Sequence, residues 1–378
     1  MINDQRLLDC FIDLVRIKSL TYDERGVADY IKKTLGLLDV DITEDGTGAK
    51  IGGNTGNVIV RMSGDEGMSP VLLAAHMDTV EPADGVEPRI DNGVISSSGG
   101  TILGADDKAG CAVMIELLRV LDEDRVDHPP IEAVFTVAEE KGLKGAYHLD
   151  IDALKARTGF VMDGDGPTGI IITKAPFQDY FKTKFTGKAA HAGVEPERGI
   201  SAIEAASKAI SNMRLGRIDD ETTANIGVIN GGRAINIVAD ETVIEGEARS
   251  HSISRLKLQV EHMKECVAGA AKETGAGYDI DIVRLYDGFS FRSEDTLVKA
   301  VIKAAERSGA DPRLMTSGGG SDTNVFNKAG IESLNISCGQ QRVHTTEESI
   351  AVIDMVKAVR MLEMLLRPEM PRIDGRDE

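Results

Sequence analysis

The sequence predicts an α/β protein in which a central, mostly parallel sheet is flanked by helices and a smaller α+β domain is inserted. Two observations favour this fold class. Segments with helical spacing of apolar residues alternate with short strand-like runs in residues 1–175 and again in 290–378, as in a sheet covered by helices. Between them, residues 176–289 follow the order β-α-β-β-α-β of a ferredoxin-like unit. We therefore expect domain boundaries near Pro176 and Phe289.

In the first part of the larger domain, helices are expected where apolar residues recur every three to four positions, and strands where a short apolar run stands alone. The expected helices are Ile2–Ile17, Glu24–Leu37 and Asp107–Leu121. The expected strands are Asn57–Met62, Val71–Ala75, Ile131–Ala138 and Gly159–Met162. Three of these four strands are followed closely by acidic or histidine side chains.

The same criteria define the elements of the inserted domain and of the last part of the chain. In the inserted domain we expect, in order, a strand, a helix, two strands, a helix and a strand: Gln178–Gly187, Ile200–Met213, Thr223–Ile229, Thr242–Arg249, Ile253–Lys272 and Tyr278–Leu285. Helices and strands then alternate again, starting with a helix: Ser293–Ser308, Arg313–Thr316, Asp322–Ala329, Ser333–Ser337 and Glu348–Leu366. The polar end Arg367–Glu378 is expected to fray.

Composition excludes several classes of protein. A net charge of −19 argues against a nucleic-acid-binding surface, which needs clustered Lys and Arg. No apolar stretch approaches the ~20 residues that span a bilayer, and the first residues lack the pattern of a secretion signal. The cysteines are widely spaced, which favours reduced thiols: Cys10, Cys111, Cys266 and Cys338. We expect a cytoplasmic protein with no nucleic-acid or membrane partner.

His76 and Asp78 directly follow the apolar run Val71–Ala75. Taken alone, they read as a loop histidine and a capping aspartate. Open α/β sheets, however, present functional groups at the carboxyl ends of their strands. In that setting His76 is a candidate metal ligand, and Asp78 is the carboxylate that fixes its tautomer and raises its basicity.

Asp106 follows a glycine-rich approach, Ser97–Gly104, and precedes a strongly predicted helix. It could simply cap that helix, because aspartate side chains accept hydrogen bonds from the first backbone N–H groups. A flexible loop that brings two adjacent aspartates to a helix start also suits an oxygen ligand for a cation. An aspartate in this position could bridge two metal ions.

Glu139 and Glu140 follow the predicted strand in Ile131–Ala138. Two neighbouring carboxylates at the end of an apolar strand are unfavourable without a cation or a proton. They can therefore divide the work, with one binding metal and the other acting on water as a general base.

Asp163 and His344 complete the pattern, each following a predicted strand. Alternatively, Asp163 is a turn residue before glycine and His344 a polar loop residue. Together, two histidines and several carboxylates at one sheet edge suit Zn²⁺, Mn²⁺ or Co²⁺. Five ligands exceed what one tetrahedral ion requires, so two bridged ions fit better.

These residues, in this order, resemble the metallopeptidase family that includes peptidase T, carboxypeptidase G, aminoacylase and succinyl-diaminopimelate desuccinylase. The resemblance covers nearly the whole chain, including the inserted domain. Within the family, Gly104–Gly110 and Ser317–Asp322 are most similar to the peptidase T-like branch. The resemblance implies a lid domain, two divalent ions (Zn²⁺ foremost, with Mn²⁺ or Co²⁺ possible) and a homodimer formed through the lid.

Carried over motif by motif, the resemblance makes Asp106 the bridging ligand. It implies His76 and Asp163 at one metal, and Glu140 and His344 at the other. It further implies that Asp78 orients His76 and that Glu139 is the general base.

The lid domain also supplies residues by resemblance. His191, in Ala-Ala-His-Ala-Gly, matches a histidine that reaches an active site, although its local sequence alone is typical of a surface loop. Asn236, Arg249 and Gly318 match substrate contacts. Tripeptidases carry Arg where this chain has Gly318, which puts a strict tripeptide preference in doubt.

We therefore predict a two-metal aminopeptidase, similar to tripeptidases, that acts on short peptides. An N-acyl amino acid amidohydrolase or a carboxypeptidase could use the same metal site, and contacts around Asn236, Arg249 and Gly318 would decide between them. A non-catalytic metal-binding protein is disfavoured, because a binding protein has no need of the base Glu139.

Overall fold

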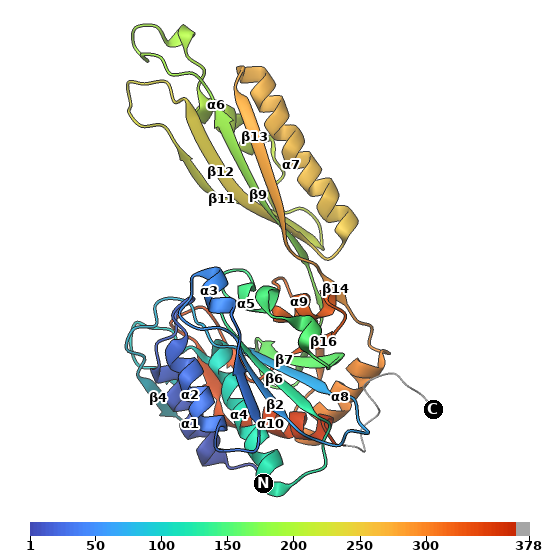
Figure 1. Cartoon of the computed structure of the whole chain (residues 1–378). Helices are drawn as coiled ribbons and strands as arrows, with labels where there is room; N and C mark the ends of the chain where they lie inside the picture. Colours follow the sequence, from blue (N-terminus) through green and yellow to red (C-terminus); the bar gives the residue numbers. More distant parts are fainter. Residues whose placement is uncertain (368–378) are drawn as a thin grey trace. The chain divides into compact units, whose positions relative to one another are not determined.

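The computed structural model describes residues 1–367 (Figure 1). The end that the sequence predicts to fray lies outside the described residues, apart from Arg367. The chain divides into two compact units. Unit 1 comprises Met1–Thr173, Ser290–Ser317 and the described chain from Ser321 onward, and unit 2 comprises Lys174–Phe289 with Gly318–Gly320. Along residues 1–367, no helix is long and apolar enough to cross a membrane.

Unit 1 is built on a sheet with the strand order β1-β2-β6-β3-β7-β16-β8-β14, and β15 also pairs with β8. In chain order the strands are β1 (Asp41–Glu44), β2 (Val58–Met62), β3 (Val71–His76), β6 (Ile131–Thr136), β7 (Thr158–Gly164), β8 (Ile170–Ala175), β14 (Phe289–Ser290), β15 (Arg313–Thr316) and β16 (Glu332–Ser337). The four central strands β6, β3, β7 and β16 are parallel. On their two sides β2 and β8 pair antiparallel with them, and β1 pairs antiparallel with β2. This confirms the predicted α/β class. Every residue of β3 and β6 is buried, as expected where both faces of a sheet are covered.

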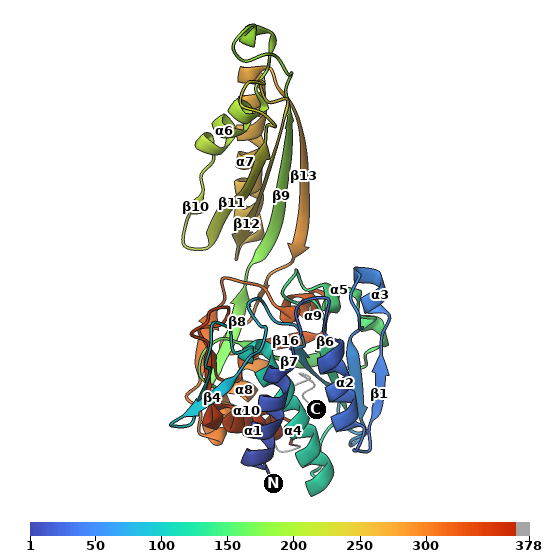
Figure 2. The same cartoon turned by 90° about the vertical axis from the view of Figure 1, so that its left-hand side faces the viewer.

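Two groups of helices cover this sheet (Figures 1 and 2). In the first, α4 packs on β3 and β7 and is contacted by its neighbours; the group is α1 (Asp4–Arg16), α2 (Arg25–Leu35), α4 (Ala105–Asp124), α8 (Thr296–Ser308) and α10 (Val352–Leu365). In the second, α9 packs on β7 and β16; the group is α3 (Thr47–Ile51), α5 (Lys144–His148) and α9 (Asp322–Lys328). The amphipathic spacing that predicts α1 buries Leu7, Phe11 and Leu14, and Asn3 caps its start by accepting from the Arg6 N–H.

A small second sheet in unit 1 was not predicted. Its strand order is β17-β18-β5-β4, with β4 (Pro88–Asp91), β5 (Val94–Ser97), β17 (Gln340–Gln341) and β18 (Ser349–Ala351). The predicted helix Glu348–Leu366 is wrong at its start, because Ser349–Ala351 pairs with β5 and the helix begins only at Val352. Strands this short carry too little periodicity to be read from sequence.

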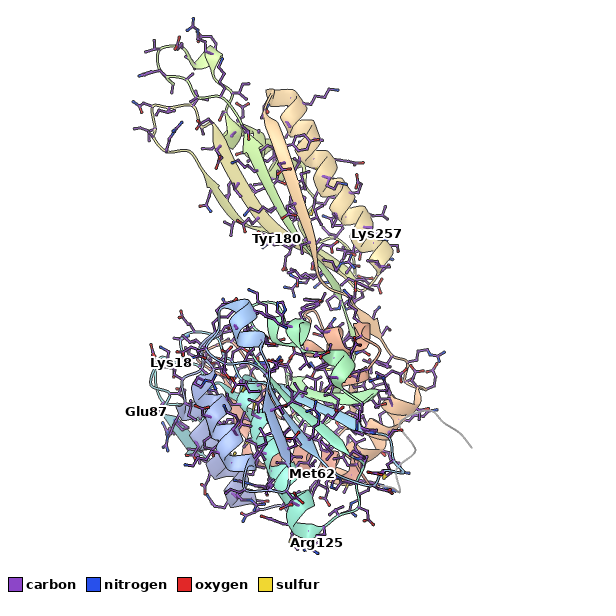
Figure 3. The ribbon with its side chains drawn as sticks, in the orientation of Figure 1. Lys18, Met62, Glu87, Arg125, Tyr180 and Lys257 are labelled. Atoms are coloured by element: carbon purple, nitrogen blue, oxygen red, sulfur yellow. The ribbon has the colours of Figure 1, made fainter. Side chains whose placement is uncertain are left out.

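Unit 2 is an antiparallel sheet with the order β10-β11-β12-β9-β13. Its elements in chain order are β9 (Phe177–Thr186), α6 (Ala202–Asn212), β10 (Gly216–Arg217), β11 (Thr222–Gly231), β12 (Glu241–Ser250), α7 (Ile253–Thr274) and β13 (Gly277–Tyr286). Apart from the two-residue β10, this is the predicted ferredoxin-like order. Phe181 and Phe185 of β9 belong to the core shared with α6 and α7. Figure 3 labels Tyr180 on β9 and Lys257 on α7.

Candidate metal centre

The predicted ligands of unit 1 meet at one edge of the central sheet. His76 is the last residue of β3, and Asp163 lies at the end of the neighbouring parallel strand β7. Glu140 follows β6, the other parallel neighbour of β3. Asp106 stands at the start of α4, and His344 lies between β17 and β18. Parallel strands all end on the same side, so local sequence alone brings three of these five side chains together.

Asp106 lies between the two imidazoles. Its Oδ1 is 3.1 Å from His76 Nε2, and its Oδ2 is 3.2 Å from His344 Nε2. Glu140 Oε1 is 2.9 Å from His344 Nε2, whereas Asp163 Oδ1 is 3.9 Å from His76 Nε2. Each oxygen of Asp106 therefore faces a different histidine. His76 has Asp163 as its second carboxylate neighbour, and His344 has Glu140.

This cluster has the chemistry of a divalent-metal site. One ligand atom from each of His76, Asp106 and Glu140 lies within 4.8 Å of the others. Although burial acts to raise it, hydrogen bonds from His344 and His76 hold the pKa of Asp106 well below its usual range. Burial, followed by the nearby Asp106 and Glu139, raises the pKa of Asp163 well above its usual range. Imidazole and carboxylate ligands gathered at such a density fit Zn²⁺ and similar ions, whose charge would compensate the carboxylates.

Asp78 connects the ends of two strands. The nearest partner of His76 Nδ1 is the main-chain oxygen of Asp78, at 2.9 Å, while the carboxylate Oδ1 is 3.5 Å away. The carboxylate itself accepts hydrogen bonds from the backbone N–H of Glu139 at 3.0 Å and of Glu140 at 3.2 Å, and from Thr21 Oγ1 at 2.7 Å. Asp78 thus contacts His76 and also holds the segment that carries both glutamates.

Glu139 is 9% exposed and lies beside the ligand cluster. Burial raises its pKa well above the usual range, and although a protonated His76 opposes this, the nearby Asp322 and Glu140 add to it. A carboxylate whose pKa is moved towards neutral pH is suited to accept and return a proton.

The sequence did not predict a role in the site for three buried acidic residues near the cluster, Asp107, Glu348 and Asp322. Asp107 accepts from His76 N–H at 3.2 Å and Gly110 N–H at 3.1 Å. Glu348 accepts from the N–H groups of Gly104 and Asp106 at 2.7 and 3.0 Å, and Asp322 accepts from Thr136 Oγ1 at 2.6 Å. Asp107 had a sequence signal as the second of two adjacent aspartates, and Asp322 had one because it ends the glycine-rich run Ser317–Asp322. Glu348 had none.

The remaining predicted residues belong to unit 2. His191 is exposed, and the N–H of its neighbour Ala192 donates to the main-chain oxygen of Asn236 at 3.0 Å. Arg249 forms a bidentate ion pair with Glu247, with both N–O distances at 2.9 Å. It also donates a hydrogen bond to the main-chain oxygen of Gly318 at 3.3 Å. Within unit 2, His191 therefore lies near Asn236, and Arg249 contacts Gly318.

The metal-free protein should lose stability as pH rises. Hydrogen bonds with Asp106 and Glu140 raise the pKa of His344 from 6.5 to about 10. A base whose pKa is raised by folding contributes stability that is present in full below pH 6.5 and is lost as pH rises to about 10. Because His344 is half-exposed, we expect the Tm of metal-free protein to fall by only roughly 2–4 °C over this range relative to His344→Ala, measured by calorimetry. Parallel pH profiles of the two proteins would contradict this.

Comparison with known proteins gives consistent matches. The sequence model of the peptidase family M20/M25/M40 matches residues 72–367. The uncharacterized protein YqjE of Bacillus subtilis (strain 168) is 43% identical over 366 residues, which cover 97% of this chain and 99% of that protein. The structure of aminopeptidase PepT from Bacillus cereus ATCC 10987 superposes with a TM-score of 0.88 at 43% identity, covering 97% of this chain and 98% of that one. A tripeptidase from Staphylococcus aureus subsp. aureus Mu50 gives a TM-score of 0.91 at 39% identity, with the same coverage. The chain therefore belongs to peptidase family M20/M25/M40.

Proposed function

We propose that this protein is a two-metal aminopeptidase that releases the N-terminal residue of short peptides, tripeptides among them. The observation that carries the proposal is Asp106, whose two carboxylate oxygens each face a different imidazole, close to the buried Glu139. The relatives named aminopeptidase PepT and tripeptidase support the choice of substrate.

The metal ligands in this proposal are those of the cluster. Asp106 would bridge the ions, His76 and Asp163 would hold one, and Glu140 and His344 would hold the other. Zn²⁺ suits these nitrogen and oxygen donors best, with Mn²⁺ or Co²⁺ as substitutes. When bound, such ions polarise the scissile carbonyl and lower the pKa of water from 15.7 towards ~7.

The protein residues handle the proton. Glu139 takes a proton from the attacking water while the water oxygen forms a bond to the peptide carbonyl carbon. When the C–N bond breaks, Glu139 returns this proton to the leaving amine nitrogen, so the side chain ends the cycle unchanged. Asp78 keeps Glu139 in place through the hydrogen bond to its backbone N–H.

Peptides with and without a free N-terminus test the proposal. Metal-stripped protein is reloaded with Zn²⁺, Mn²⁺ or Co²⁺ and assayed against dialanine, trialanine and their N-acetylated forms. We expect free alanine to be released from trialanine, with turnover of N-acetyl-trialanine at least about tenfold slower, because a site built for a free amine rejects its blocked analogue.

Each other outcome identifies a different function. Cleavage of the N-acetylated series alone would indicate an N-acyl amino acid amidohydrolase. Release of alanine from N-acetyl-trialanine as fast as from trialanine would indicate a carboxypeptidase, because the blocked peptide has a free residue only at its C-terminal end. Metal binding without turnover of any peptide would indicate a binding protein. Four further assignments remain predictions: His191 as a catalytic residue that stabilises the oxyanion, Asn236, Arg249 and Gly318 as substrate-binding residues, a homodimer through unit 2 and a cytoplasmic location.

A further inference from the structure

The segment that follows β6 is held at four consecutive backbone N–H groups, all by side chains. The N–H of Val137 donates to Asn57 Oδ1 at 3.1 Å, and that of Ala138 donates to Glu24 Oε1 at 3.0 Å. The next two donate to the carboxylate of Asp78, from Glu139 at 3.0 Å and from Glu140 at 3.2 Å. Three side chains, each from a different part of unit 1, thus define the path of the chain into the two glutamates.

Ala138 needs this support. Its φ is 51°, in the left-handed region that residues other than glycine rarely adopt. A backbone in such a region persists only where its surroundings impose it. The Ala138 conformation turns the chain out of β6 immediately before Glu139, so the contacts that hold Ala138 also set the direction of the general base.

Glu24, the partner of Ala138, is fully buried. Its Oε1 accepts from the N–H groups of Ala138 and Tyr22, both at 3.0 Å, whereas Oε2 is buried with no hydrogen-bond partner among residues 1–367. Burial, followed by the charge of Asp78, raises the pKa of Glu24 to about 7. Burying a carboxyl group with one oxygen unsatisfied is unfavourable for folding. Such a group is more readily understood as serving the site than as stabilising the fold.

Glu24 ends a loop that also braces the end of β3. Ser19 Oγ donates to the main-chain oxygen of Met77 at 2.8 Å, and the Thr79 N–H donates to the main-chain oxygen of Ser19 at 2.9 Å. Thr21 donates to Asp78, as described above. The loop between α1 and α2, residues 17–24, therefore contacts both strand ends that lead to the ligand cluster. It lies before residue 72, where the family match begins.

We propose that Glu24 is a positioning residue for Glu139, acting through its hydrogen bond to the backbone of Ala138. The inference rests on the proposed function for its kinetic consequence, but the hydrogen bond can be tested without any assay of activity. What matters in this arrangement is an acceptor oxygen at the right distance from Ala138, not the negative charge of Glu24.

Two conservative variants separate acceptor from charge. Glu24→Gln keeps an oxygen at the distance of Oε1 and removes the charge, while Glu24→Asp keeps the charge and withdraws the oxygen by one methylene. We expect Glu24→Asp to lower kcat by about 10–100-fold, because small misplacement of a catalytic group has effects of this size. KM should stay within about threefold, and kcat of Glu24→Gln should stay within about threefold of the wild type.

Glu132→Asp is the matched control. Glu132 is also a buried glutamate that accepts two backbone hydrogen bonds, from Lys155 and Ala156 at 2.8 Å each. Glu132 lies at the opposite end of β6, where it pairs with Arg61 of β2. Figure 3 labels the next residue of β2, Met62. The control should lower Tm comparably but leave kcat within about twofold, because a loss of stability alone does not change the catalytic step.

Hydrogen exchange of the Ala138 amide measures this hydrogen bond directly, and the amides of residues 137, 139 and 140 report on the segment around it. These amides should exchange at least about tenfold faster in Glu24→Asp and at nearly the wild-type rate in Glu24→Gln and Glu132→Asp. Unchanged exchange in Glu24→Asp, or equal losses of kcat in Glu24→Asp and Glu24→Gln, would overturn the positioning role. If the wild type cleaves no peptide, the proposed function fails, and the exchange rates still decide the role of Glu24.

Discussion

Glu139→Gln should lower kcat by roughly 10²–10⁴-fold, the contribution typical of a general acid–base group. The amide is nearly isosteric with the carboxylate but cannot take a proton from the attacking water. The backbone N–H of residue 139 should still donate to Asp78, so the fold of the segment should be retained. Steady-state kinetics on trialanine gives kcat, and elemental analysis should still find two metal ions per chain.

The neighbouring glutamate provides the contrast. Glu140 Oε1 lies 2.9 Å from His344 Nε2, within the ligand cluster. Glu140→Gln should therefore weaken metal affinity by at least about 10–100-fold, the loss typical even of a carboxylate that only supports a ligand. Near-normal turnover by Glu139→Gln would remove Glu139 as the base, and loss of metal from Glu139→Gln but not Glu140→Gln would reverse the two roles.

Asp106→Ala should abolish activity by removing both ions. Its carboxylate is the group shared by the two histidines, at 3.1 and 3.2 Å, so no other single substitution in the cluster affects both halves equally. Without it, His76 retains only Asp163 and His344 retains only Glu140, too few ligands for tight binding. Metal titration followed by calorimetry should show loss of high-affinity binding, and kcat should fall by at least about 10³-fold.

Asp107→Asn is the appropriate control for Asp106→Ala. Asp107 is adjacent in sequence and also buried, yet its oxygens accept hydrogen bonds from the backbone N–H groups of His76 and Gly110. This variant keeps one acceptor oxygen and should retain two ions per chain, with lower Tm. If Asp106→Ala still bound two ions at wild-type affinity, a bridging aspartate at this position would be excluded.

Much of the candidate site could be predicted because its information is local. A buried parallel strand is a short apolar run, and its carboxyl end is known once its direction is known. His76, Asp163 and the Glu139–Glu140 pair all lie at or just after the ends of such runs, so the shared carboxyl end of the sheet brings them near one another. The same local periodicity predicts the helices and the ferredoxin-like order of unit 2.

Other parts of the site could not be predicted, because their partners lie far apart in sequence. Glu24 meets Ala138 across 114 positions, and Glu348 meets Asp106 across 242. In the local sequence each of them is simply the first residue of a predicted helix, Glu24–Leu37 for one and Glu348–Leu366 for the other. Neither has a pattern that marks a buried acceptor.

The sequence by itself thus determined the fold class and the residues at the strand ends, because hydrophobic periodicity and strand direction are properties of short segments. Only the tertiary structure decided which oxygen of Asp106 faces which histidine, and that Asp78 and Glu24 hold the backbone that carries Glu139. These are choices of hydrogen-bond partner for buried polar groups. They depend on the distance and direction between distant segments, which exist only after the chain has folded.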